Sequence, residues 1–184
     1  MGDMMERNLS HIALFAALIA VLGLFPKIDL SAGVPITAQS LGIMLAGTVL
    51  GAKRGAIAVL LFLTLVAAGL PLLAGGRGGI GVFAGPSVGF LVGFPVAAFV
   101  SGWIMERTTL SPAVAATAAS VIGGIGVLYL FGIAGMALML GKTLGEATFL
   151  AAAFLPGDAL KAVLAGLITQ SLSRMRPTSL LSRA

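Results

Sequence analysis

The sequence predicts an all-α, polytopic membrane protein, folded as a compact bundle of six transmembrane helices. Hydrophobic residues make up 59% of the 184 positions, and charged residues only 9%. The mean hydropathy is +1.12. Because soluble domains contain roughly 25% charged residues, this chain has too few polar side chains to cover a soluble surface. Its apolar runs are continuous rather than alternating, which favours helices over the strands of a membrane barrel.

The helical spans can be followed in order along the chain. At about 20 residues per span, the length allows five or six spans in a single integral membrane domain, residues 1–184. Proline interrupts a helix, so the first run ends at Pro26 and the third at Pro71, whereas Pro112 is a favourable first helical residue for the fifth. The predicted spans cover residues 11–25, 37–50, 56–70, 88–105, 112 to about 130 or 140, and 156–172.

Two segments between the spans have a different character. Residues 75–87 are dense in glycine and too exposed along the backbone for a helix that faces lipid. Residues 141–155 begin with polar side chains and continue with alanines, which predicts a loop and a short partial helix.

The lysines and arginines predict the orientation in the membrane. With six spans, both chain ends share a side with the second and fourth loops. That side carries seven cations, against three on the other. Cytoplasmic loops are enriched in Lys and Arg, so we expect both ends in the cytoplasm. The seven are Arg7, Lys53, Arg54, Arg107, Arg174, Arg176 and Arg183; the three are Lys27, Arg77 and Lys142.

The composition argues against several functions. The formal charge of +5 does not indicate nucleic-acid binding, because the cations are spread singly along the chain. With no cysteine there is no disulfide or thiolate site. The single histidine, His11, has no neighbouring carboxylates, so we predict neither a metal nor a cofactor. A serine hydrolase built on Ser87 would have His11 as its sole histidine base.

Asp158 and Lys161, at the start of the last span, are the most informative residues. They are three positions apart and therefore lie on one helix face. They could simply neutralise each other, or Lys161 could extend to the membrane surface. Ionisable groups within a span are expensive and usually face a cavity. Asp158 also lies where the helix dipole favours an anion, so we expect the pair to bind a ligand.

Four further residues are candidates for a polar binding site. Arg77 lies among glycines that permit close approach to a ligand, and its planar fork suits a carboxylate. A solvated charge in a flexible loop is an equally good interpretation. Thr37, Gln39 and Ser87 are possible hydrogen-bonding groups at helix starts. Gln39 taken singly is better explained as a contact between helices.

The first span contains two interleaved pairs of small residues, which are Ala13 with Ala17 and Ala16 with Ala20. This spacing permits close approach of another helix. The approaching helix could belong to the same bundle or to a partner protein.

Five motifs in order resemble the BioY family, the biotin-binding S components of energy-coupling factor (ECF) transporters. They extend over about residues 34–173, nearly the whole chain. The motifs are VPITAQSLG at 34–42, LGAKRGA at 50–56, AAGLP at 67–71, GPSVGFLVGF at 85–94 and FLPGDALK at 154–161.

The resemblance implies a six-helix S-component fold that binds one biotin near its extracellular face, beneath covering loops. It also implies a transmembrane coupling protein (the T component) and two ATP-binding cassette ATPases as partners. In related S components the alanine pattern of the first helix contacts the coupling protein. The family often has Thr-Gly-Gly-Tyr at positions 87–90, so here Phe90 lacks the hydroxyl that a tyrosine offers.

Biotin suits the candidate residues. Its ureido ring offers two N–H donors and a carbonyl, and its valerate ends in a carboxylate. We hypothesise that Asp158 accepts from the ureido N–H groups, and that Lys161 or Arg77 meets the carboxylate or the carbonyl. Phe83 and Trp103 are lesser candidates for the apolar walls. High-affinity capture of biotin for uptake is therefore the predicted function.

Three other functions are weaker interpretations of the same residues. In a self-sufficient secondary carrier, Asp158 would relay protons. An enzyme acting on lipids would need more carboxylates, since beyond residue 106 there are only Glu146 and Asp158. A purely structural bundle would bind no small molecule. The sequence contains no Walker motif, so ATP-driven uptake requires another subunit.

Overall fold

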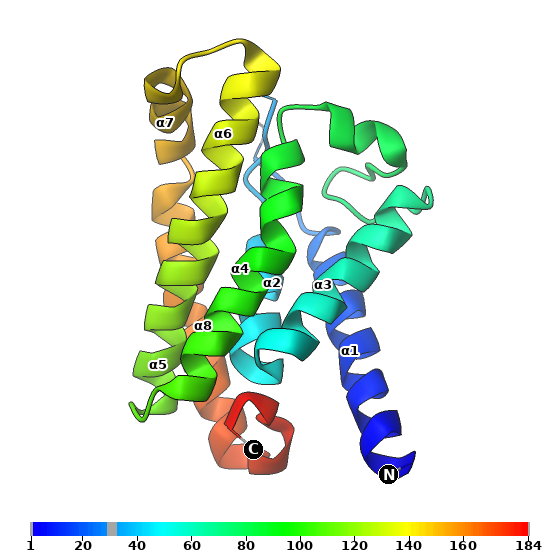
Figure 1. Ribbon diagram of the computed structural model, residues 1–184, viewed down its shortest axis with the longest axis vertical. Coiled ribbons are helices and arrows are strands. Elements are labelled where there is room, and N and C mark those ends of the chain that lie inside the picture. Colours follow the sequence, from blue (N-terminus) through cyan, green and yellow to red (C-terminus); the bar gives the residue numbers. More distant parts are fainter. Residues whose placement is uncertain (1, 29–32, 184) are drawn as a thin grey trace.

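The computed structural model describes residues 2–28 and 33–183, with side chains from Glu6 onward. Its helices pack together as one bundle (Figure 1). They are α1 (Gly2–Leu22), α2 (Gln39–Leu50), α3 (Ala52–Ala67), α4 (Val88–Arg107), α5 (Pro112–Ala119), α6 (Leu128–Leu140), α7 (Leu144–Ala152) and α8 (Leu155–Met175). The π-helical segment η2 (Ser120–Val127) joins α5 to α6, and the short 3₁₀ segments are η1 (Ile80–Ala84), η3 (Pro177–Ser179) and η4 (Leu181–Arg183).

The predicted all-α fold is confirmed. The six predicted spans correspond to α1, α2, α3, α4, the continuous α5–η2–α6 rod and α8. By length and composition, two helices of the described chain could cross a membrane, Val88–Arg107 and Pro112–Leu140. The pair α7 and α8, bent by 58° at its break, would make a third. Central in the bundle is α4, which packs against α2, α3 and α6.

Two helices begin at least four residues before their predicted starts. The first helix begins nine residues before the predicted start, because its polar residues are compatible with a helix. The Ser10 hydroxyl and His11 Nδ1 each contact the backbone carbonyl four residues earlier. The third helix begins at Ala52, four residues before the predicted start, so Lys53 and Arg54 lie in its first turn. Glu106 Oε1 accepts a hydrogen bond from Ala52 N at 2.8 Å and satisfies a backbone donor there.

The glycines of the fifth span do not end it, and the rod continues to Leu140. They are sites of close packing. A Cβ at Gly135 would lie 2.6 Å from Gly89 Cα, and one at Gly132 would overlap the Phe90 ring. Absence of side chains therefore lets α6 approach α4, an advantage that outweighs the low helix propensity of glycine.

The segment 141–155 forms the predicted loop and short helix. Gly141 ends α6 in the left-handed conformation, at φ 61°. Thr143 and Glu146 form a reciprocal capping box that begins α7. The chain then bends into α8, whose second residue is Pro156.

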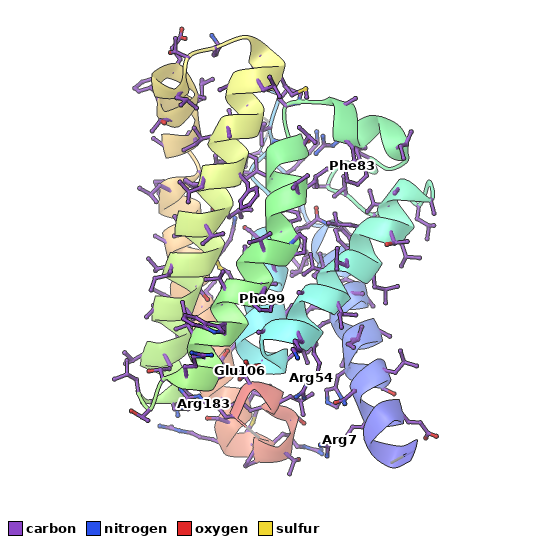
Figure 2. The ribbon with its side chains drawn as sticks, in the orientation of Figure 1. Arg7, Arg54, Phe83, Phe99, Glu106 and Arg183 are labelled. Carbon is purple, nitrogen blue, oxygen red and sulfur yellow. The ribbon has the colours of Figure 1, made fainter. Side chains whose placement is uncertain are left out.

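The two ends of the bundle differ. At the terminal end lie the start of α1, the α2–α3 and α4–α5 turns and the end of α8 (Figure 1). The opposite end, the loop end, holds η1 and the α6–α7 connection. Arg7, Arg54 and Arg183 all lie toward the terminal end, as the predicted grouping of cations requires (Figure 2).

Candidate ligand-binding cavity

A cavity lies among the amino-terminal ends of α2, α4 and α8 and the loops around residues 33–37 and 73–77. It encloses about 560 Å³ of empty space, part of it open to solvent. Most of its lining is apolar, with a few polar groups that converge. The lining residues are Val34, Pro35, Ile36, Thr37, Gln39, Ser40, Leu73, Arg77, Ser87, Phe90, Leu91, Phe94, Leu128, Phe154, Asp158 and Lys161.

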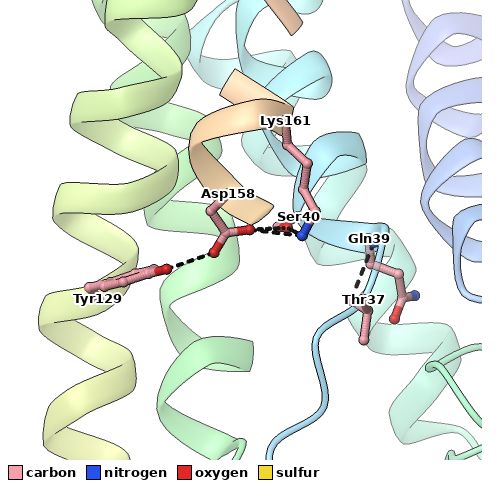
Figure 3. A network of polar contacts seen from close by, with 6 residues as sticks. All are labelled: Thr37, Gln39, Ser40, Tyr129, Asp158 and Lys161. Atoms are coloured by element: carbon pink, nitrogen blue, oxygen red, sulfur yellow. Dashed lines mark hydrogen bonds and ion pairs between the residues drawn. The ribbon is translucent and has the colours of Figure 1, made fainter. Parts of the chain in front are cut away.

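Asp158 is the centre of the polar network (Figure 3). It lies in the first turn of α8, where the helix dipole favours its negative charge, and is only 6% exposed. Oδ1 accepts hydrogen bonds from Ser40 Oγ at 2.9 Å and from Lys161 Nζ at 2.8 Å. Oδ2 accepts one from the Tyr129 hydroxyl at 2.8 Å. Three donors from three helices therefore hold the carboxylate in one orientation.

Asp158 and Lys161 form an ion pair one helical turn apart, as their spacing predicts. Lys161 Nζ also donates to Ser40 Oγ at 3.0 Å. A carboxylate offers about four acceptor positions, and an ammonium group has three protons. Three acceptor positions and two protons are used, so each partner retains capacity for a ligand.

Arg77 contributes a second cation to the cavity lining. Its Nε donates to Ala74 O at 3.3 Å, and its backbone pairs with Leu73 in an isolated bridge. These bonds fix the base of the side chain. Its two terminal nitrogens make no hydrogen bond with any residue in the described ranges, so the planar fork remains available to a ligand.

The two hydroxyl candidates differ in their hydrogen bonding. Ser87 is 7% exposed, and within the described part of the chain its hydroxyl has no hydrogen-bond partner. It is therefore a free donor and acceptor in the cavity wall. Thr37 Oγ1 accepts from Gln39 N at 3.3 Å, which satisfies one of the backbone donors left unpaired at the start of α2.

Gln39 has a structural role that its sequence position alone does not reveal. Its Nε2 donates to Ile19 O at 3.2 Å and to Leu72 O at 3.0 Å, and its Oε1 accepts from Ala74 N at 3.1 Å. The amide thus ties α1 and the loop after α3 to the start of α2. Although Gln39 lines the cavity, both amide protons are already used.

Aromatic rings form one wall of the cavity. Phe90 packs edge-on against Tyr129 and against Phe154, with ring centroids 6.2 Å and 5.7 Å apart. Phe83 is half-buried in η1 but does not line the cavity. Trp103 lies near the far end of α4, toward the terminal end, and is absent from the lining. Of the predicted aromatic candidates, only Phe90 is in the wall.

Seven predicted site residues therefore line one cavity, namely Thr37, Gln39, Ser87, Arg77, Phe90, Asp158 and Lys161. Sequence reasoning did not select Tyr129, Ser40 or Phe154. Tyr129 is the sole tyrosine of the chain, in an otherwise apolar span. A buried tyrosine hydroxyl usually finds a hydrogen-bond partner. A single tyrosine in an apolar span was therefore the feature of the sequence that could have identified Tyr129.

The alanine pairs of α1 face different ways. Ala13 and Ala17 are exposed, whereas Ala16 is 4% exposed in the main core and Ala20 packs against the same core. Only the first pair is therefore presented to the outside of the bundle.

Among the described residues, no group of three or more His, Cys, Asp or Glu side chains could hold a metal ion. The polar groups of the cavity suit an organic ligand with both hydrogen-bond donors and a negative charge.

Comparison with known proteins gives one consistent result. The model of the BioY family matches residues 2–178. The biotin transporter BioY of Rhodobacter capsulatus is 51% identical over 189 residues, covering 97% of this chain and 100% of that protein. The Rhizobium etli protein of the same name is 52% identical over 176 residues, covering 92% and 94%. A crystal structure of the S-component for biotin from an ECF-type ABC transporter superposes with a TM-score of 0.89, at 31% identity and 95% coverage of both chains. This chain is a member of the BioY family.

Proposed function

We propose that this chain captures biotin as the substrate-binding subunit of a vitamin uptake transporter. The observation that carries the proposal is the Asp158–Lys161 pair, held by Ser40 and Tyr129 in the wall of a largely apolar cavity. Membership of the BioY family and the likeness to an S-component for biotin support the same ligand.

The chemistry of the cavity matches biotin group by group. The remaining acceptor position of Asp158 takes a ureido N–H, and the unpaired Ser87 hydroxyl is a further polar contact. The carboxylate needs a cation, for which Arg77 has its two terminal nitrogens available. Lys161 has one proton left and meets the ureido carbonyl or the carboxylate. The fused rings and aliphatic tail lie on Phe90, Phe154 and the apolar residues around them.

Uptake in this proposal depends on other proteins. The sequence has no Walker motif, so energy comes from two ATP-binding cassette ATPases, coupled through a transmembrane T component. The exposed Ala13 and Ala17 of α1 form the surface that contacts the coupling protein, because small residues permit close helix approach.

The orientation in the bilayer follows from the cations. The terminal end, which carries Arg7, Arg54 and Arg183, faces the cytoplasm. The cavity opens at the other side, where biotin arrives from outside the cell. The protein is multi-pass in the bacterial inner membrane.

Titration calorimetry of biotin against the purified protein in detergent tests the function. We expect one-to-one binding, and Asp158→Ala should weaken it by about 1.5–3 kcal/mol, the value of a hydrogen bond to a charged group. Glu146→Ala is the matched control, because it removes a carboxylate outside the cavity lining. Absence of binding by folded wild-type protein would rule out biotin as the ligand, and unchanged affinity in Asp158→Ala would refute the assigned site.

A further inference from the structure

A second hollow lies toward the terminal end of the bundle, between the first turn of α3 and the end of α4. It encloses about 650 Å³ of empty space, including space open to solvent. Arg54, Phe99 and Glu106 lie there, well away from Phe83 at the loop end (Figure 2). We call it the basic groove; it is lined by Ala52, Lys53, Arg54, Phe99, Trp103, Glu106 and Arg107.

The charges of the basic groove do not cancel. Three cations, from Lys53, Arg54 and Arg107, share it with the single carboxylate of Glu106. Glu106 uses Oε1 to accept the Ala52 N–H at 2.8 Å, which fixes the first turn of α3 beside the last turn of α4. Within the described ranges none of the three cations forms an ion pair. The fold therefore gathers positive charge here without supplying its counter-ion.

Trp103 orients one of these cations. The Arg107 guanidinium carbon lies 4.6 Å from the centre of the Trp103 ring, the geometry of a cation–π contact. Trp103 is 43% exposed. Tryptophan is enriched where a membrane protein crosses the headgroup region, so this pair has the composition of a site at the depth of lipid phosphates.

An exposed apolar stripe leads away from the groove along α4. Val92, Val96, Phe99 and Trp103 follow the i, i+4, i+7, i+11 spacing of one helix face. All four side chains are at least 36% exposed. In a bilayer this face contacts acyl chains, and the three cations lie where it ends.

We infer that the basic groove binds an anionic phospholipid. The acidic headgroup lies among Lys53, Arg54 and Arg107, and an acyl chain follows Phe99 and Val96 along α4. Basic pockets between transmembrane helices bind acidic headgroups in this way. An acidic protein segment would satisfy the cations but not the apolar stripe, so the lipid is the better fit. The inference is independent of what the cavity at the other end of α4 binds.

Trp103 makes the test direct, because it is the single tryptophan of the chain. Its fluorescence reports on the groove and on no other site. The protein is reconstituted in phosphatidylcholine nanodiscs that contain a small fraction of lipid brominated near the headgroup, either phosphatidylglycerol or phosphatidylcholine. Bromine quenches tryptophan only at short range, so the ratio of quenching by the two lipids measures the local preference for the anionic headgroup.

We expect brominated phosphatidylglycerol to quench Trp103 at several-fold lower membrane fractions than brominated phosphatidylcholine. Each basic side chain near an anionic lipid contributes about fivefold in affinity. Arg54→Gln should therefore lower the preference about fivefold, and Lys53→Gln/Arg54→Gln/Arg107→Gln should abolish it. Arg174→Gln/Arg176→Gln is the matched control, since it removes two exposed cations near the end of α8, outside the groove.

Two results would overturn the inference. Equal quenching of the wild-type protein by the two lipids would show that no anionic headgroup is preferred, and a protein partner would become the better candidate. A preference that survives in the triple variant, or that the control variant loses equally, would mean that general surface charge causes it. Excess soluble glycerophosphate separates a lipid from a free phosphate: relief of quenching by it would refute a site that requires the acyl chain.

Discussion

The Tyr129 hydroxyl donates a 2.8 Å hydrogen bond to Oδ2 of Asp158, although Tyr129 does not itself line the cavity. Its ring packs edge-on against Phe90, which does line it. Tyr129 is therefore a positioning residue. It fixes the Asp158 carboxylate from outside the cavity lining and supports the aromatic wall. Lys161 and Ser40 hold the other oxygen of the same carboxylate.

Tyr129→Phe keeps the ring but removes the hydroxyl. We expect biotin affinity to fall by about 1 kcal/mol, the net value of one typical hydrogen bond, as measured by titration calorimetry. Because the effect passes through Asp158, it should disappear in an Asp158→Ala background. An equal loss in both backgrounds would contradict the positioning role.

The ion pair of Asp158 and Lys161 predicts how the stability of the ligand-free protein responds when one charge is removed. The side chains of Lys161 and Asp158 are 14% and 8% exposed, so removal of one charge leaves the other buried and unpaired. Asp158→Asn or Lys161→Met alone should destabilise the protein by roughly 3–5 kcal/mol. The double variant should lose less stability than either single variant. Thermal unfolding in detergent measures this. Additive losses in the double variant would mean that the two charges do not compensate each other.

The cation that meets the biotin carboxylate can be identified with a neutral analogue. If Arg77 holds the carboxylate, Arg77→Gln should weaken biotin by about 1.5–3 kcal/mol and leave biotinamide almost unaffected. Lys161→Gln should then weaken both ligands. Lys142→Gln, a neutralised cation in the α6–α7 loop, is the control. The reverse pattern would mean that Lys161, and not Arg77, contacts the biotin carboxylate.

Substitutions in the two alanine pairs of α1 distinguish an effect on partner binding from an effect on folding. Ala17 is exposed, so Ala17→Leu should reduce copurification with the coupling protein and leave biotin affinity unchanged. Ala16 is buried, so Ala16→Leu should instead overpack the core. We expect the free energy of unfolding of the isolated subunit to fall by about 1–3 kcal/mol, as measured by thermal unfolding. Val114→Leu, at an exposed position of α5, controls for added surface bulk. Full copurification of Ala17→Leu would exclude this surface.

Some features could be predicted from the sequence because they depend on local chemistry. Transfer of apolar side chains into lipid is nearly additive, so hydropathy and proline positions predicted the helical bundle. The spacing of Asp158 and Lys161 predicted their contact, since residues three apart share a helix face. The five family motifs assigned residues from distant parts of the chain to one binding site. Seven of the predicted site residues do line one cavity.

Other features depend on contacts between distant parts of the chain, which local chemistry cannot predict. Ser40 and Asp158 are 118 residues apart, and only helix packing brings them to 2.9 Å. The amide of Gln39 is used between α1 and the loop after α3, which depends on where those elements lie. Glycines at 132 and 135 weaken a helix by propensity, yet the helix continues because α4 packs against them. The sequence alone therefore determined the membrane helices and the chemical groups available, and tertiary packing decided which groups are engaged and which remain free, because hydrogen bonding and close packing depend on distances in space.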